Sequence, residues 1–178
     1  MAGLRTAPVL DAIRDNGPVL LVPAAWLAAV GAIAGVLEAD GILIAHVVMA
    51  AFITFFAVTG WQAMSTGAFR AWRLVLVVGL PVTLAGLAGF LVDAGEMVLW
   101  TASLVGWMVL PAAGLAYTAR EMPEARLLYA GTAVLSFAGA LIALAALVLD
   151  VDQLLYAGIG AVAVGQTVGI VDAARRDR

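Results

Sequence analysis

The chain contains one histidine, which is the only side chain inside a long apolar stretch that titrates near neutral pH. His46 lies four positions after Ile42, where an apolar run begins, or about 6 Å along a helix axis. At helical spacing it is followed by a small, weakly polar stripe made of Ala50, Thr54, Ala57 and Trp61. We therefore expect His46 to face the interior of a helix bundle. There it would either hydrogen-bond a threonine, a backbone carbonyl or a water, or act as a ligand or a proton-responsive switch.

Other residue types that carry chemistry are absent from the middle of the apolar runs. No Asp, Glu, Lys or Arg lies there, whereas proton- and ion-coupled transport usually needs one. The absence of cysteine excludes disulfides, thiolate metal sites and cysteine nucleophiles. We find no nucleophile motif, no phosphate-binding glycine loop and no cluster of carboxylates and imidazoles with metal-ligand spacing. The sequence therefore predicts no catalytic residue and no metal site.

A haem ligand is the most specific role open to His46. An axial histidine needs a sixth ligand on the opposite face of the haem. Met49 lies only three residues away on the same predicted helix and cannot reach that face. Met97 or the partner subunit's His46 would have to supply the second ligand.

The residues Gly-Ile-Leu-Ile-Ala-His at 41–46, with Gly-Trp at 60–61, resemble the start of helix 2 in small six-helix relatives of haem-copper oxidase subunit I. The resemblance covers roughly helices 1 and 2, a third of the chain. In that family an Ala-His near the outer end of helix 2 supplies a low-spin haem ligand, so the resemblance implies that role for His46. The second histidine often found two residues later is Val48 here, and no histidine follows, which excludes oxidase chemistry.

Composition identifies lipid as the solvent of this chain. Of its 178 residues, 65% are hydrophobic and 12% are charged, and all nine basic residues are arginine. Soluble domains are typically about 45–50% apolar and about 25% charged. A net charge of −3 provides no basic surface for nucleic acid, so the expected partner is the bilayer.

The fold class predicted from these runs is all-α, an integral membrane bundle of six transmembrane helices. The apolar runs, each about 20 residues long, cover 19–37, 42–64, 74–92, 97–118, 127–149 and 154–171. Hydrocarbon leaves no water for unpaired backbone groups, so runs of this length should be helical. The arginines all lie before the first run, after the last run, or between runs 2 and 3 and runs 4 and 5. The other three connections contain acidic residues and no basic ones. By the positive-inside rule, both termini are cytoplasmic and the protein lies in the cell membrane.

The segments that flank the transmembrane domain, 19–171, are short. Residues 1–18 are expected to be cytoplasmic, and Pro8 can open a short interfacial helix that ends at Asn-Gly-Pro 16–18. The alternative is a partly ordered polar tail. Residues 172–178 form a cytoplasmic tail with three arginines.

Small residues and prolines indicate how the helices pack. Pairs of glycines four residues apart let helix backbones approach closely, and such pairs occur at Gly31 and Gly35 and at Gly165 and Gly169. Pro81 and Pro111 lie inside predicted helices, where each removes a backbone hydrogen bond and should bend its helix.

Three functions are compatible with this sequence. The first is a non-enzymatic polytopic protein, either an accessory or scaffold subunit of a membrane complex or a small binding module, acting as a homo-oligomer or with other subunits. The second is a haem-binding membrane protein with His46 as axial ligand. The third is a channel or facilitator for a small solute, lined by glycine and threonine. No cofactor other than haem is suggested.

Overall fold

The computed structural model describes the backbone of residues 7–176 and side chains from residue 16 onward. Its main elements are six long helices: α1 (Ala7–Ile33), α2 (Ala39–Thr59), α3 (Phe69–Ala88), α4 (Glu96–Glu121), α5 (Arg126–Leu149) and α6 (Asp152–Arg176). Two short 3₁₀ helices, η1 (Ala63–Ser65) and η2 (Pro123–Ala125), lie in connections. All six long helices are long and apolar enough to cross a membrane, so the described residues confirm the prediction of an all-helical fold with six helices of membrane-spanning length.

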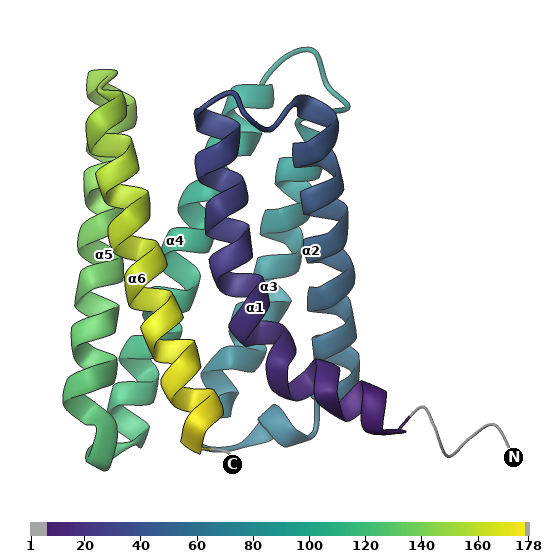
Figure 1. Ribbon diagram of the computed structural model, residues 1–178, viewed down its shortest axis with the longest axis vertical. Coiled ribbons are helices and arrows are strands. Elements are labelled where there is room, and N and C mark those ends of the chain that lie inside the picture. Colours follow the sequence, from purple (N-terminus) through teal and green to yellow (C-terminus); the bar gives the residue numbers. More distant parts are fainter. Residues whose placement is uncertain (1–6, 177–178) are drawn as a thin grey trace, which may run out of the picture.

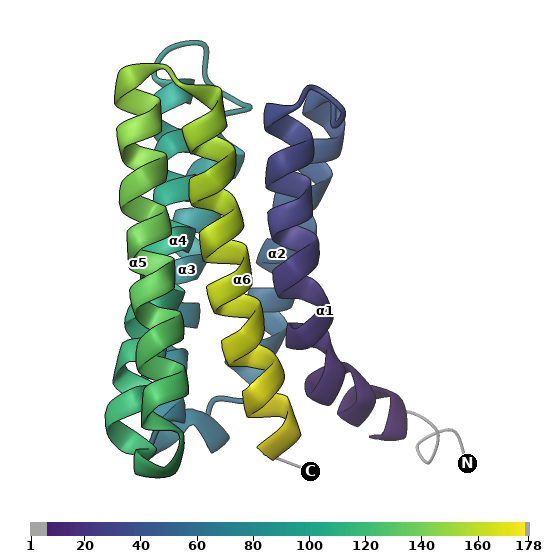
Figure 2. The same cartoon turned by 60° about the vertical axis from the view of Figure 1, so that its left-hand side comes forward.

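The helices run alternately up and down and form one bundle (Figures 1 and 2). The turns between α1 and α2, between α3 and α4, and between α5 and α6 lie at one end, which we call the acidic end because its loops carry Glu38, Asp93 and Asp150. The start of α1, the end of α6 and the connections that contain η1 and η2 lie at the other end. We call this the arginine end, since Arg70, Arg120 and most other arginines of the chain are there.

Helix α1 ends in a glycine turn, which explains one of the paired glycines. Gly35 has a left-handed φ of +68°, the Gly35 amide donates to the Ala32 carbonyl at 3.1 Å, and the Val36 amide donates to the Gly31 carbonyl at 2.9 Å. This is the Schellman pattern of helix termination. No atom of another helix lies near a Cβ placed on Gly31 or Gly35. The expectation that these two glycines mark a helix contact is therefore wrong: they end α1 instead.

The start of α1 also differs from the expected short helix closed at residues 16–18. The helix continues from Ala7 to Ile33 with Pro18 and Pro23 inside it. Figure 2 shows its first turns leaning away from the bundle. Each proline leaves one carbonyl of the preceding turn without its amide partner, which bends a helix without ending it. Gly17 packs against α2, since a Cβ there would lie 3.0 Å from Cζ of Phe56.

The tightest packing joins α5 and α6. A Cβ on Gly139 would lie 2.6 Å from the carbonyl oxygen of Gly158, and a Cβ on Gly158 would lie 2.6 Å from the backbone nitrogen of Ala143. The two backbones thus touch. Further along α6, a Cβ on Gly165 would meet the Thr132 carbonyl of α5 at 2.8 Å, and Gly169 packs against α4. Small residues therefore set the distance between the last three helices.

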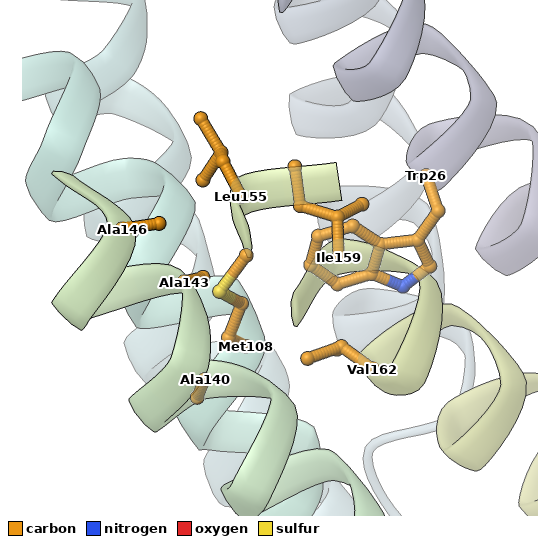
Figure 3. Packing of buried hydrophobic residues seen from close by; sticks show 8 residues of the cluster. All are labelled: Trp26, Met108, Ala140, Ala143, Ala146, Leu155, Ile159 and Val162. Carbon is orange, nitrogen blue, oxygen red and sulfur yellow. The ribbon is translucent and has the colours of Figure 1, made fainter. Parts of the chain in front are cut away.

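The apolar core has two parts: one around Leu115 and Tyr129 toward the arginine end, and one between α4, α5 and α6 toward the acidic end. Met108, Ala143, Ile159 and Val162 are fully buried in the second part, and Trp26 of α1 covers them (Figure 3). Helices α1 and α2 contribute far less, and along α2 only Ile53 and Gly60 are fully buried. The bundle is thus a compact α3–α6 unit with α1 and α2 added on one side.

Candidate functional site

His46 is held in one ring orientation by its own helix. Its Nδ1 lies 2.9 Å from the Ile42 carbonyl oxygen, and because a carbonyl can only accept, Nδ1 must carry the proton in this bond. Nε2 of the neutral ring then has a free lone pair. A backbone partner of this kind commonly orients histidines that ligate metals through Nε2, so the bond alone does not separate a packing role from a ligand role.

Nε2 points at α3 and α4 rather than into open space. A Cβ on Gly86 of α3 would collide with Nε2 and would lie 2.7 Å from the hydroxyl oxygen of the buried Ser103 of α4. The other flank of the imidazole meets Phe90, whose ring centroid is 5.9 Å away in an edge-on arrangement. His46 therefore faces the neighbouring helices, and glycine at position 86 is what makes room for its ring.

A second ring fills the adjacent notch of α3. A Cβ on Gly89 would lie 2.5 Å from Nε1 of Trp100, and the Trp100 and Phe90 ring centroids are 5.3 Å apart. The Trp100 indole N–H is buried and has no hydrogen-bond partner among the described residues. The ring of His46 from α2 thus packs on Gly86, and the ring of Trp100 from α4 packs on Gly89, near the end of α3. Together they form a ring cluster, made of His46, Gly86, Gly89, Phe90, Trp100 and Ser103.

The ring cluster does not fit a haem. Coordination places the porphyrin plane about 2 Å from the ligating nitrogen, but Nε2 is already against the backbone of α3 at Gly86. The proposed sixth ligand, Met97, is 66% exposed on the first turn of α4. Nothing in the described chain brings the Met97 sulfur to the opposite face of a ring bound at His46. We derive no haem chemistry from this site.

The predicted polar stripe on α2 faces the bundle only in part, because Ala50 and Ala57 are half-buried, as His46 is, whereas its polar members are not. Thr54 and Trp61 are exposed, whereas Ile53 and Gly60 are buried. His46, Ile53 and Gly60 are spaced by seven residues, which is the repeat of helices that cross in a left-handed manner. A spacing of four residues, used to predict the stripe, drifts off such a contact within two turns. The stripe prediction was therefore wrong at Thr54 and Trp61, which are exposed.

A hydrogen-bonded network crosses the middle of the bundle. The Trp26 indole of α1 donates to Oε1 of Gln166 on α6 at 3.1 Å. The amide nitrogen of Gln166 donates to the backbone carbonyls of Trp107 at 3.1 Å and Met108 at 3.2 Å, both on α4. Both amide hydrogens and the oxygen of Gln166 are thus used. Three helices are joined at one buried side chain, which is 5% exposed.

Pro111 explains why a carbonyl of α4 is open to Gln166. In an uninterrupted helix the amide of residue 111 would donate to the carbonyl of Trp107, but proline has no N–H. The Trp107 carbonyl is therefore left without its helical partner inside the membrane, where such a group is costly. The side chain of Gln166 supplies the missing donor from another helix.

The network extends into α3 through the side chain of Trp107. Its indole donates to the Thr83 hydroxyl at 2.9 Å, and that hydroxyl donates to the Gly79 carbonyl at 3.0 Å. The indole lies directly over Gly79, where a Cβ would come within 2.7 Å of the ring. Trp107 thus bonds and packs in the same contact.

The mirror-image contact joins the same two helices near the arginine end. The Trp72 indole of α3 donates to the Thr118 hydroxyl of α4 at 3.2 Å, and that hydroxyl donates to the Gly114 carbonyl at 2.9 Å. In both helices a tryptophan is followed by glycine seven residues later and by threonine eleven residues later. This shared spacing was a readable signal in the sequence, and the sequence interpretation missed it. We call the two contacts the tryptophan clasps.

The described residues contain no group of three or more His, Asp or Glu side chains that could hold a metal ion. A shallow groove is present on the surface, but it lies at the arginine end of α2, the opposite end of that helix from His46. Comparison of the chain with protein-family models, with curated proteins and with solved structures finds no match. Function must therefore be argued from the geometry alone.

Proposed function

We propose that the protein is a non-enzymatic accessory or scaffold subunit of the cell membrane, with both termini in the cytoplasm. The observation that carries the proposal is the Gln166 network. The side chains of its members, Trp26, Thr83, Trp107 and Gln166, bond to one another and to backbone carbonyls, and so join α1, α3, α4 and α6. None of them is left facing a solute or a cofactor, so their effect is to hold a fixed transmembrane shape.

Passage of a solute through this centre would require the Gln166 hydrogen bonds to break. The same region is filled by Met108 and Ile159, both with no exposed surface. A facilitator would also need a polar lining that continues from one end to the other. These features favour a scaffold over a channel. Proteoliposomes should accordingly show the same glycerol and water flux as protein-free liposomes.

The side of the bundle best suited to a protein partner is α2. Its outward residues include Ile44, Val47 and Val58, all more than half exposed, with Ala51 between them. A photo-crosslinking residue at Val47 should give a discrete protein adduct in native membranes, and Ala51→Trp should abolish it. The same residue at Leu141, an equally outward position on α5, serves as control. Lipid adducts alone at Val47, or a protein adduct that Ala51→Trp leaves unchanged, would contradict the proposal.

The proposed orientation rests on the arginine end. Cytoplasmic loops are rich in Lys and Arg, and the loops of the acidic end have none. Alkaline phosphatase fused after Arg178 should be inactive, whereas a fusion after Asp150 should be active, since the enzyme folds only outside the cytoplasm. The reverse pattern would overturn the orientation and leave the six-helix fold unaffected.

A further inference from the structure

The groove at the arginine end of α2 combines an apolar wall with polar groups. It is lined by Ala57, Val58, Thr59, Trp61 and Gln62. Ala57 and Val58 lie on the last turn of α2, where Ala57 is half-buried and Val58 exposed, while Trp61 and Gln62 follow the helix end and are exposed. Amphipathic side chains such as tryptophan favour the membrane interface. The groove therefore has the polarity profile of a phospholipid, with an apolar part toward the bilayer centre.

Positive charge lies beside the groove and is not neutralised by the protein. The Arg73 guanidinium sits 4.7 Å from the centroid of the Trp61 ring, which is itself 47% exposed. No Asp or Glu occurs between residues 41 and 92. Neither Arg73 nor Arg70 makes an ion pair with another described residue, whereas Arg176 is paired with Asp172. The first turn of α3 is thus a net positive site, with Arg70 exposed and Arg73 half-buried, and it is complementary to a phosphate.

The end of α2 adds hydrogen-bond acceptors to this positive site. The last carbonyls of a helix have no amide partner within it. Of these, the Phe56 carbonyl is capped by the Gly60 amide, while the carbonyls of Ala57, Val58 and Thr59 receive no such bond within the described chain. A ligand that suits the groove must therefore carry a negative charge for the arginines and donors for the carbonyls.

We propose that this groove binds an anionic phospholipid whose head group carries hydroxyls, of the phosphatidylglycerol type. The acyl chain lies along Ala57 and Val58, the phosphate interacts with Arg73 and Arg70, and the head-group hydroxyls donate to the free carbonyls of α2. Trp61 joins the two halves of the site, because Arg73 lies over its ring and Trp61 also lines the groove. A bare phosphate ion satisfies only the charged part of this site.

Native mass spectrometry of the purified full-length protein in detergent tests the assignment. The probes are phosphatidylglycerol, phosphatidylmethanol, which has the same charge without head-group hydroxyls, and zwitterionic phosphatidylcholine. We expect one tightly retained phosphatidylglycerol, with weaker retention of phosphatidylmethanol and least of phosphatidylcholine. Equal retention of the first two would refute a hydroxyl-bearing ligand, and equal retention of all three would refute the site.

Variants locate the bound lipid. Arg73→Gln should weaken phosphatidylglycerol binding about five-fold, the effect of one basic group near a phosphate. Arg120→Gln removes the same charge from the last turn of α4, also at the arginine end, and should leave binding unchanged. Trp61→Ala, at an exposed position that the fold does not depend on, should weaken binding at least as much as Arg73→Gln. Equal losses from Arg73→Gln and Arg120→Gln, or displacement of the lipid by millimolar inorganic phosphate, would overturn the proposal.

Discussion

Replacing Gln166 with methionine tests the central network with little change in side-chain length. The substitution removes three hydrogen bonds, one from Trp26 and two to the α4 carbonyls. Hydrogen bonds between membrane helices contribute about 0.6 kcal/mol on average, so the three together predict a loss of about 2 kcal/mol in the free energy of unfolding. Titration with sodium dodecyl sulfate in mixed micelles, followed by circular dichroism, measures this loss.

A double-mutant cycle with Pro111→Ala isolates the part of that loss due to the proline. Alanine at position 111 restores the amide that a regular helix directs at the Trp107 carbonyl, so the bond from Gln166 to that carbonyl becomes partly redundant. Gln166→Met should therefore cost about 0.6 kcal/mol less in the Pro111→Ala background, and up to about 1.7 kcal/mol less if this bond is among the strongest.

Additivity would refute the reasoning. If Gln166→Met costs the same in both backgrounds within about 0.3 kcal/mol, Gln166 does not compensate for Pro111. Thr54→Val is a suitable control, because the Thr54 hydroxyl bonds only to the Ala50 carbonyl of its own helix and is exposed. That substitution should change stability by less than about 0.5 kcal/mol and show no coupling to Pro111→Ala.

Three further predictions concern the glycine contacts, the tryptophan clasps and the ring cluster. Gly158→Ala should lower the unfolding free energy by about 1–3 kcal/mol, because its Cβ would lie 2.6 Å from a backbone nitrogen of α5. Gly160→Ala places its Cβ in open space and should leave the unfolding free energy unchanged. Equal effects of the two substitutions in the same titration would contradict the contact. Trp107→Phe should lower the unfolding free energy by about 0.6 kcal/mol. In that background Thr83→Val should cost less than it does alone, and strict additivity would show that the hydrogen bond between the two side chains contributes nothing. Protein purified after expression with haem supply should show no Soret band, and a band abolished by His46→Ala would overturn the fit argument.

The membrane-spanning segments could be predicted from the sequence because every backbone polar group inside hydrocarbon must be hydrogen-bonded within the protein. Long apolar helices meet this requirement. Each of the six apolar runs became one helix, with boundaries moved by a few residues except at the start of α1, which begins twelve residues before the predicted run. The run 42–64, for example, became α2 ending at Thr59, because Gly60 caps the helix and the chain turns into η1. The direction of the bundle across the membrane stays a prediction, since it depends on charge bias and not on packing.

The contacts between helices were harder to predict. Gln166 is a lone uncharged amide in an apolar run, so neither hydropathy nor periodicity marks it. Its role becomes clear only when the missing amide of Pro111 is traced to a particular carbonyl and a donor is sought on another helix. The prediction of which α2 side chains face the bundle was wrong at Thr54 and Trp61 for a different reason. A four-residue spacing follows one side of a straight isolated helix, whereas the contacts between crossed helices repeat every seven residues. The role of Gln166 and the bundle-facing side of α2 could not be predicted because both depend on how the helices pack against one another.

The pairing of Pro111 with Gln166 also has a consequence for the order of assembly. The carbonyl left open in α4 is made early, and the amide that closes it belongs to the last helix of the chain. Sliding α6 by a single turn would move that amide about 5.4 Å away, so the defect in α4 fixes the vertical position of α6. A chain that stops before α6 keeps an unmatched polar group inside the bilayer. The bond from Gln166 to the Trp107 carbonyl therefore makes the satisfaction of a backbone group in α4 depend on the correct placement of α6.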